Sequence, residues 1–134
     1  MTLLLDSHIL LWALADDERL SDAARSLLLD EANTIYFSAA SVWELSIKHL
    51  LHPEAIPFSS RELTSLCRAA GFEALDIQCH HVTAMESLRR AENAPRHKDP
   101  FDRIILAQAK AEKMTLLTHD RMFTDYLESC VMIV

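Results

Sequence analysis

Residues 97–109 read His-Lys-Asp-Pro-Phe-Asp-Arg-Ile-Ile-Leu-Ala-Gln-Ala, a polar segment that leads into a helix with a regular apolar side. Asp is a favoured N-cap residue and Pro is favoured at the first helical position, so Asp99 and Pro100 predict the start of this helix. The helical pattern continues to about Lys113, and the short apolar stretch Thr115–Thr118 after it predicts a strand. A helix that leads into a short apolar strand is typical of α/β proteins.

The same alternation of strands and helices continues on both sides of this unit. Further strands are expected over Thr2–Leu5, Thr34–Ser38, Glu73–Ile77 and Val131–Val134. Further helices are expected over Ile9–Leu14 and Ala23–Leu29 (N-cap Ser21), from Val42 onward, from a Ser59–Glu62 capping box to near Gly71, and over Val82–Arg90 and Met122–Leu127. Strands that are separated by helices, with little room for hairpins, predict an α/β fold built on a parallel sheet. With 134 residues, the chain is expected to form a single domain over 1–134.

The composition excludes several classes of function. The chain has 13 Lys and Arg against 20 Asp and Glu, a formal net charge of −7, so it does not hold nucleic acid by bulk positive charge. Gly71 is its one glycine, which excludes the glycine-rich phosphate loops of the GxGxxG and Walker types. Cys67, Cys79 and Cys130 fit neither a disulfide framework nor a thiolate zinc site, and they are expected to be small buried hydrophobic residues.

The sequence shows no signal for a membrane or for export. No apolar run reaches the roughly 18 residues of a membrane helix. The N-terminal stretch Met1–Asp6 has no basic start and meets an acid at once, which argues against a signal peptide. A cytoplasmic location is therefore expected.

Acidic residues lie at or near the ends of several predicted strands. Asp6 closes the first strand, Glu44 opens the helix after the second, Asp99 and Asp102 lie in the first turn of the long helix, and Asp120 follows the fourth strand. Because ligands of open parallel sheets bind beyond the carboxyl ends of the strands, these acids are expected near one rim. Crowded carboxylates repel one another unless protonation or a cation relieves them. Hard oxygen ligands of this kind select Mg²⁺ or Mn²⁺, ions commonly used to act on phosphate esters.

Each of these acids also has a purely structural interpretation. Asp6 and Asp120 are placed to cap the helices that follow them. Asp99 and Asp102 match an N-cap followed by an acid that favours the helix dipole. Ser41 and Glu44 form a capping-box pattern, in which Glu44 would only reach back to a backbone N–H. Caps and active sites occupy the same places in a fold, so spacing alone does not decide between the two interpretations.

Four blocks of sequence carry a resemblance to a known family. They are Leu4–Trp12 (LLDSHILLW), Ser38–Lys48 (SAASVWELSIK), His97–Ala109 (HKDPFDRIILAQA) and Leu116–Asp120 (LLTHD). In their order, residue types and spacing they resemble the PIN domain, and more narrowly the VapC toxins of bacterial toxin–antitoxin pairs. The similarity runs over essentially the whole chain, and the Asp-Pro-Phe-Asp-Arg block is its most specific part.

The resemblance implies a fold, a site and a reaction. The fold would be PIN-like, with a central twisted parallel sheet of about 4–5 strands flanked by helices. The catalytic and metal-binding acids would map onto Asp6, Glu44, Asp102 and Asp120, with Asp99 either a further ligand or only the helix cap. One or two Mg²⁺ or Mn²⁺ ions would lower the pKa of a bound water and neutralise charge on the phosphate of an RNA. The resemblance further implies 5′-phosphate and 3′-hydroxyl products, a homodimer, and a VapB-like antitoxin whose tail blocks the site.

Four polar residues are candidates to contact the substrate or to support the acids. Thr118 matches the small hydroxyl residue that the family often keeps beside the fourth acid, where it could hold a water or a phosphate oxygen. Ser7 follows the first acid directly. Lys48 lies one turn after Glu44, where an i, i+4 ion pair on the helix surface is favoured over a phosphate contact. Arg103 is expected to pair with a neighbouring acid rather than with RNA.

Three further features have weaker functional interpretations. The basic residues Arg89, Arg90, Arg96, His97 and Lys98 flank the acidic site, and they would either meet the RNA backbone or form a solvated loop. The adjacent residues Cys79, His80 and His81 cannot form a tetrahedral zinc site alone. Trp12 and Trp43 have apolar neighbours at helical spacing, which favours core packing over base stacking.

The sequence therefore predicts a metal-dependent endoribonuclease of the VapC type, with two alternatives. The first is a PIN-like module that binds RNA or a partner without cutting, and the intact acids at all four positions count against it. The second is a metal-dependent phosphatase with Asp6 as the phosphorylated nucleophile. That chemistry usually needs a second Asp shortly after the first, which Ser7 and His8 do not supply.

Overall fold

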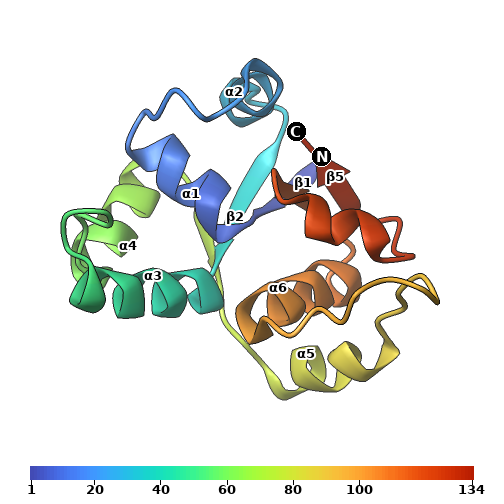
Figure 1. Cartoon of the computed structure of the whole chain (residues 1–134). Coiled ribbons are helices and arrows are strands. Elements are labelled where there is room, and N and C mark those ends of the chain that lie inside the picture. The colour runs from blue at the N-terminus through green and yellow to red at the C-terminus, as the bar shows by residue number, and fades with distance from the viewer.

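A five-stranded sheet forms the centre of the fold in the computed structural model, which describes residues 1–134 (Figure 1). All neighbouring strands pair in parallel, in the order β3-β2-β1-β4-β5. The strands are β1 Thr2–Leu5, β2 Thr34–Ser38, β3 Glu73–Leu75, β4 Thr115–Thr118 and β5 Val131–Ile133. The parallel α/β architecture expected from the sequence is confirmed.

The position of β1 between β2 and β4 decides which residues meet at the rim of the sheet. Leu5 is paired with Phe37 on one side and with Leu117 on the other. The residues that follow these three are Asp6, Ser38 and Thr118. Segments that are far apart in the sequence therefore end side by side at the carboxyl edge of the sheet.

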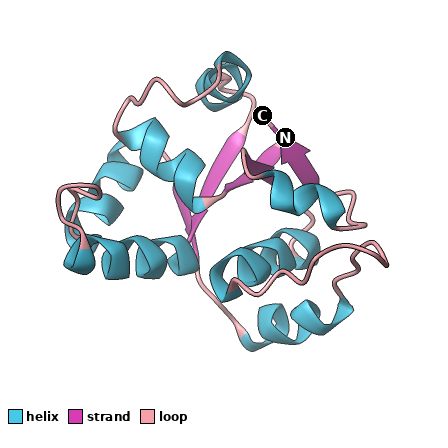
Figure 2. Cartoon of the chain, in the orientation of Figure 1, coloured by secondary structure: helices cyan, strands magenta, loops and turns pink.

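Helices cover both faces of the sheet, as Figure 2 shows. The helices are α1 Ser7–Leu14, α2 Asp22–Leu29, α3 Ala39–Leu51, α4 Ser60–Ala69, α5 Cys79–Ala84 and α6 Pro100–Ala111, with the short 3₁₀ segments η1 Met85–Ser87 and η2 Arg121–Asp125. None of these helices is both long enough and apolar enough to cross a membrane.

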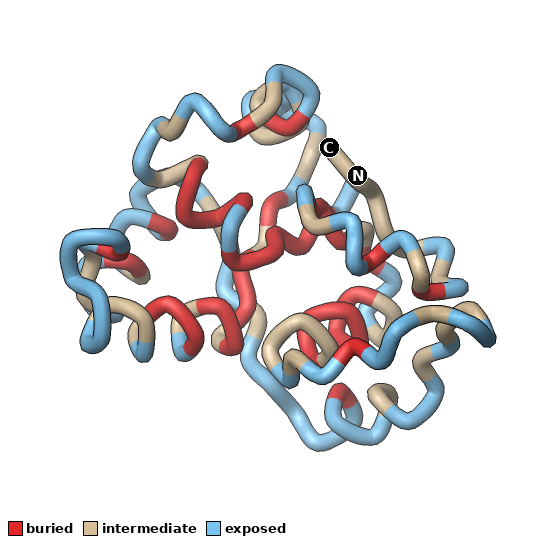
Figure 3. The backbone as a smooth tube through the Cα atoms, in the orientation of Figure 1, coloured by how far each residue is buried: buried red, intermediate tan, exposed pale blue.

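The core is divided between the two faces because side chains alternate along a strand. Leu3 and Leu5 of β1 pack with apolar residues of α1, α2 and α4 on one face. Leu4 points to the other face and packs with Ile104, Ile105 and other residues of α6. Figure 3 shows the buried residues gathered on the central strands and on the inner sides of the helices.

Most helix starts follow the caps expected from the sequence. Ser21 caps α2, Ser59 and Glu62 form a capping box at α4, and Asp99 caps α6 with Pro100 at its first position. The capping box expected from Ser41 and Glu44 is wrong, since α3 begins earlier with Ser38 as its N-cap.

Two expected helices and one strand are shorter or less regular than predicted. In place of a helix over 82–90, α5 ends at Ala84 and continues only as η1. Arg89 and Ala91 instead make backbone hydrogen bonds with Leu127 and Asp125, which draws this segment into an extended form. The helix expected over 122–127 is the 3₁₀ segment η2, and the strand expected over 73–77 ends at Leu75.

The burial of three residues differs from expectation. Trp12 is buried as predicted, with 8% of its surface exposed, but Trp43 is 61% exposed, so its assignment to the core is wrong. It lies on the outer side of α3, while Leu45 of the same helix faces the core. Cys67 is buried as expected, whereas Cys79 is exposed and Cys130 is only partly buried.

Candidate acidic active site

The five acids at the rim of the sheet influence one another electrostatically. The pKa of Asp102 is raised to about 8, first by burial and then by repulsion from the carboxylates of Asp99, Asp6, Glu44 and Asp120. Repulsion from all four means that these carboxylates lie within electrostatic range of Asp102, although no three of them have ligand atoms within 4.8 Å of one another. Such a region favours binding of a positive charge, because a cation relieves the repulsion.

Asp6 is held by hydrogen bonds from both sides of the rim. One carboxylate oxygen accepts the backbone N–H of His8 at 2.7 Å, so Asp6 is the N-cap of α1. The other accepts the hydroxyl of Thr118, from the end of β4. Burial nevertheless raises the pKa of Asp6 above its ordinary value. The cap and the site acid are thus the same residue, and the two interpretations are compatible.

Glu44 points inward from α3 toward the start of α1. Its side chain is buried; Oε1 accepts the hydroxyl of Ser7 at 2.7 Å, and Oε2 lies 2.8 Å from the ammonium of Lys48. The ion pair with Lys48 is the i, i+4 pair predicted from the sequence. Glu44 does not fold back to cap its own helix, and its neighbours instead hold a buried carboxylate toward the rim.

The start of α6 contributes two acids with different tasks. Asp99 accepts the backbone N–H groups of Phe101 and Asp102 at 2.9 and 3.2 Å, which confirms it as the N-cap. The Asp102 carboxylate Oδ2 lies 3.1 Å from Nε2 of His97. Arg103 forms no ion pair, so the expectation that it would pair with a neighbouring acid is wrong.

Thr118 connects the first and fourth acids. Its side chain is buried; the hydroxyl donates to Asp6 and accepts the backbone N–H of Asp120 at 3.0 Å. Asp120 in turn caps η2 by accepting the backbone N–H of Met122. Its one hydroxyl proton is given to Asp6, so in this structure Thr118 links Asp6 to the backbone of Asp120, and a contact with a phosphate oxygen stays a prediction.

His97, expected only as part of a basic stretch that flanks the acidic site, is buried in the structure. It is only 7% exposed, and Nδ1 lies 2.8 Å from the hydroxyl of Tyr126 while Nε2 faces Asp102. Burial first, and then the charge of Arg90, lowers the pKa of His97, which favours the neutral ring. A neutral ring that donates from Nε2 to the carboxylate accepts the Tyr126 hydroxyl at Nδ1. The sequence placed His97 beside the acids but gave no signal for its burial or for its contact with Tyr126.

The rest of the basic stretch is divided between structural contacts and solvent. Arg90 places its guanidinium 4.5 Å from the centre of the Tyr126 ring, and Arg89 donates to the carbonyl of Leu127. Arg96 and Lys98 are exposed. The segment is therefore neither a uniform solvated loop nor a continuous basic surface.

A second cluster of potential metal ligands lies at the C-terminal end of α6. His80, His81 and Glu112 are the one group of three such residues whose ligand atoms all lie within 4.8 Å of one another. His81 Nδ1 accepts the backbone N–H of Gln78, so the proton of its neutral ring is on Nε2, which donates to Glu112 at 2.8 Å. With both ring nitrogens engaged, His81 has no free lone pair for a metal. This cluster ties α5 to α6.

The acids at the rim are a better match to a hard divalent ion, although each now binds its own hydrogen-bond partner. They offer only carboxylate oxygens, with no thiolate, which is the ligand set of Mg²⁺ and Mn²⁺. Burial raises the pKa of Asp102 most, and repulsion from the neighbouring carboxylates, which a bound cation would relieve, raises it further. The residues present therefore fit such an ion.

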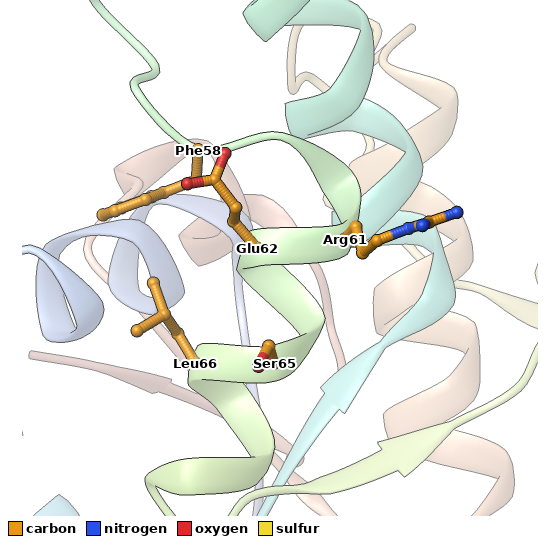
Figure 4. A pocket seen from close by; sticks show the side chains of 5 residues that line it. All are labelled: Phe58, Arg61, Glu62, Ser65 and Leu66. Carbon is orange, nitrogen blue, oxygen red and sulfur yellow. The ribbon is translucent and has the colours of Figure 1, made fainter.

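The pocket of about 510 Å³ shown in Figure 4 lies elsewhere and contains none of these acids. It is lined by Phe58 and by residues of α4, including Arg61, Glu62 and Leu66. The candidate site is therefore identified by its carboxylates and not by the size of a cavity.

Comparisons with known proteins agree with the fold. The family model of the PIN domain matches residues 3–127. A chain in the crystal structure of VapBC2 from Rickettsia felis, bound to a DNA fragment from their promoter, superposes with a TM-score of 0.69 at 20% identity, covering 100% of this chain and 98% of that chain. A chain of FitAcB from Neisseria gonorrhoeae gives 0.56 at 23% identity, covering 92% and 91%. No curated protein sequence matches the chain. The chain belongs to the PIN domain family.

Proposed function

We propose that this protein is a Mg²⁺- or Mn²⁺-dependent endoribonuclease, a toxin of the VapC type that hydrolyses RNA phosphodiester bonds. The observation that carries the proposal is the presence of four carboxylates near Asp102, whose pKa is raised to about 8 by burial first and by these charges second. Perturbed acids of this kind gather at functional sites. PIN domains are generally nucleases, which agrees with this chemistry.

The proposed ligands are Asp6, Glu44, Asp102 and Asp120, while Asp99 acts mainly as the cap of α6. A divalent ion held there supplies a water of lowered pKa and neutralises charge on the phosphate. The carboxylates must lose their protons for such an ion to bind, so metal affinity is expected to rise with pH.

The surrounding side chains fix the acids before a substrate arrives. Thr118 donates to Asp6, Ser7 and Lys48 hold the two oxygens of Glu44, and His97 lies against Asp102. Partners of this kind hold ligand carboxylates in one orientation. A site that is oriented in advance loses less entropy when the RNA binds.

An antitoxin is the proposed protein partner. The outer face of α3 exposes Trp43, Ile47, Leu50 and Leu51, an apolar surface that we call the α3 face. Apolar side chains that gather on one exposed helix face are typical of sites of protein contact. The neighbouring structure from Rickettsia felis is named for a VapB and VapC pair, and a basic antitoxin segment would complement the net charge of −7. We propose that a VapB-like antitoxin covers the α3 face, and that the toxin is a homodimer.

The test is cleavage of labelled total RNA by protein purified free of antitoxin, with Mg²⁺, Mn²⁺ or EDTA. We expect cleavage only with a metal ion, products with 5′-phosphate ends, and activity at background in Asp6→Asn and Asp102→Asn. The matched control is Asp22→Asn. Asp22 is an exposed acid at the start of α2 and is not one of the proposed ligands, so this variant should cleave RNA as the wild type does.

Two results would count against the proposal. Folded protein that binds RNA but never cleaves it would indicate the binding module instead. Cleavage that persists in both variants would mean a contaminating nuclease or a site in another place.

A further inference from the structure

We propose that a pocket beside Asp120 binds one base of the RNA next to the bond that is cut, an inference that rests on the proposed ribonuclease function. The pocket has a volume of about 240 Å³ and is lined by His8, Trp12, Arg19, His119 and Asp120. Asp120 belongs to both the acidic site and this pocket, so a ligand here would lie directly beside the acids.

The fold brings the aromatic rings of the pocket together from neighbouring elements. His8 and Trp12 lie one turn apart on α1, with their ring centres 5.8 Å apart. His119 follows β4, the strand next to β1, and its ring meets Trp12 edge-on at 5.5 Å. Arg19, from the segment after α1, places its guanidinium 5.2 Å from the Trp12 ring centre. Trp12 is buried and forms the floor of this cluster.

The side chains above that floor are exposed to solvent and have hydrogen-bonding capacity left. Arg19 uses Nε and one terminal N–H on Asp17, which leaves three of its five N–H groups free. The Nδ1 of His119 lies 2.7 Å from a backbone oxygen of Val134, which can only accept, so this nitrogen carries the proton. In the tautomer with its proton on Nδ1, Nε2 is an acceptor. Donors and an acceptor thus lie beside stacking surfaces.

A nucleobase matches this chemistry better than other small ligands. Single-stranded RNA is commonly recognised by stacking of bases on aromatic rings and guanidinium planes, with hydrogen bonds to the base edges. A free phosphate would face the carboxylate of Asp120, which disfavours it. The volume lies below the roughly 300–1,000 Å³ of sites for drug-sized ligands, and so suits a single ring system. Core packing explains Trp12, but not three exposed polar side chains gathered around it.

The experiment uses nucleosides as probes and needs no cleavage. Adenosine, guanosine, cytidine and uridine are titrated into the full-length protein in EDTA, and the indole N–H resonances of Trp12 and Trp43 are followed by NMR. Trp43, exposed on α3, is the internal control. We expect at least one nucleoside to shift the Trp12 resonance and not that of Trp43, while ribose 5-phosphate shifts neither.

Variants then assign the binding to the pocket. His119→Ala and Arg19→Ala should each weaken the nucleoside response roughly fivefold to a hundredfold, the effect of losing one stacking partner. His52→Ala and Arg121→Ala remove the same side chains from exposed positions outside the pocket and should bind as the wild type does.

No shift of the Trp12 resonance up to the solubility limit of every nucleoside would overturn the proposal, as would an equal response to ribose 5-phosphate. Nucleoside binding by a protein that cuts no RNA would overturn the proposed function, while the pocket would still be a site that binds a base. The two ideas therefore fail separately.

Discussion

Ionisation of Asp102 is strongly disfavoured in the folded protein. Its side chain is 18% exposed, and burial together with four neighbouring carboxylates raises its pKa to about 8. At position 102 a neutral side chain would leave the cap of α6 intact, because Asp99 provides that cap. The start of α6 therefore does not require a carboxyl group at position 102.

Asp102→Asn is expected to stabilise the metal-free protein at alkaline pH. The folded protein holds this proton more tightly than the unfolded chain, where the pKa is near its ordinary 3.8, so the free energy of unfolding falls as pH rises from about 4 to about 8. Asn cannot ionise, so Asp102→Asn does not lose stability in this way. Above about pH 8 its free energy of unfolding should exceed that of the wild type by about 1–3 kcal/mol, after allowance for solvent screening.

Urea unfolding in EDTA at about pH 5 and about pH 9 measures this effect, with Asp22→Asn as the exposed control. The gain should be larger at the higher pH for Asp102→Asn and absent for the control. An Asp102→Asn variant that is less stable than the wild type at the higher pH would contradict this account of the site.

Tyr126→Phe tests the contact that orients His97. The substitution removes only the hydroxyl that faces Nδ1 of the buried imidazole. A buried acceptor left without a partner costs about 1–3 kcal/mol of stability. Tyr36→Phe is the control, because the Tyr36 hydroxyl has no hydrogen-bond partner in the protein. Equal unfolding free energies for both variants would show that the Tyr126 hydroxyl does not hold His97.

At the scale of the elements, local signals predicted where helices begin better than which way they face. Ser59 with Glu62 and Asp99 with Pro100 act within one turn, and the structure has both caps. The apolar pattern of α3 was also visible in the sequence, but the pattern does not say which surface it meets. In the structure the residues of the α3 face are exposed, whereas Leu45 of the same helix is buried in the core.

Segments whose partners are distant were predicted least well. The chain over 82–90 has helical composition, yet Arg89 and Ala91 bond to the segment at 125–127 and leave the helix. Contacts of this range cannot be read from local spacing. The same reason explains why η2 forms a 3₁₀ segment capped by Asp120 instead of a longer helix.

Leu50→Glu tests the proposed partner surface on the α3 face. Leu50 is 79% exposed, so a charge there should change the free energy of unfolding by less than about 0.5 kcal/mol. Placed in a covered apolar interface, the same charge should weaken binding of the cognate antitoxin by at least about tenfold. Isothermal titration measures this, with Leu29→Glu on α2, 75% exposed, as the matched control. Unchanged affinity for Leu50→Glu would place the antitoxin elsewhere.

At the scale of the whole molecule, the parallel sheet is what makes the acids predictable. Because β1 lies between β2 and β4, residues that follow these strands meet, and the acids near the strand ends could be named from the sequence. Lys48 was predicted as the partner of Glu44, but the contacts between an acid and a residue of another element were not predicted. The Ser7–Glu44 and His97–Asp102 contacts join different elements, and they depend on how α3 and the loop before α6 pack. The assignment of residues 1–134 to a single domain stays a prediction.

With a net charge of −7, the whole molecule repels the phosphates of RNA unless cations bind to it. RNA carries a phosphate charge at every nucleotide, and an acidic rim without counter-charge repels it. Exposed Arg96 and Lys98 lie just before α6 in the sequence, but two side chains do not reverse this balance. Metal binding by the acids is thus the central claim on which hydrolysis of RNA depends.

Mn²⁺ binding, followed by electron paramagnetic resonance of the free ion, tests that claim without any substrate. The wild type is expected to take up one or two ions, and Asp6→Asn and Asp102→Asn should each weaken binding by at least about tenfold. His81→Gln, which alters the other cluster of potential ligands, should bind as the wild type does. Mn²⁺ binding that survives both Asp variants and is lost in His81→Gln would contradict the account and place the metal at the end of α6.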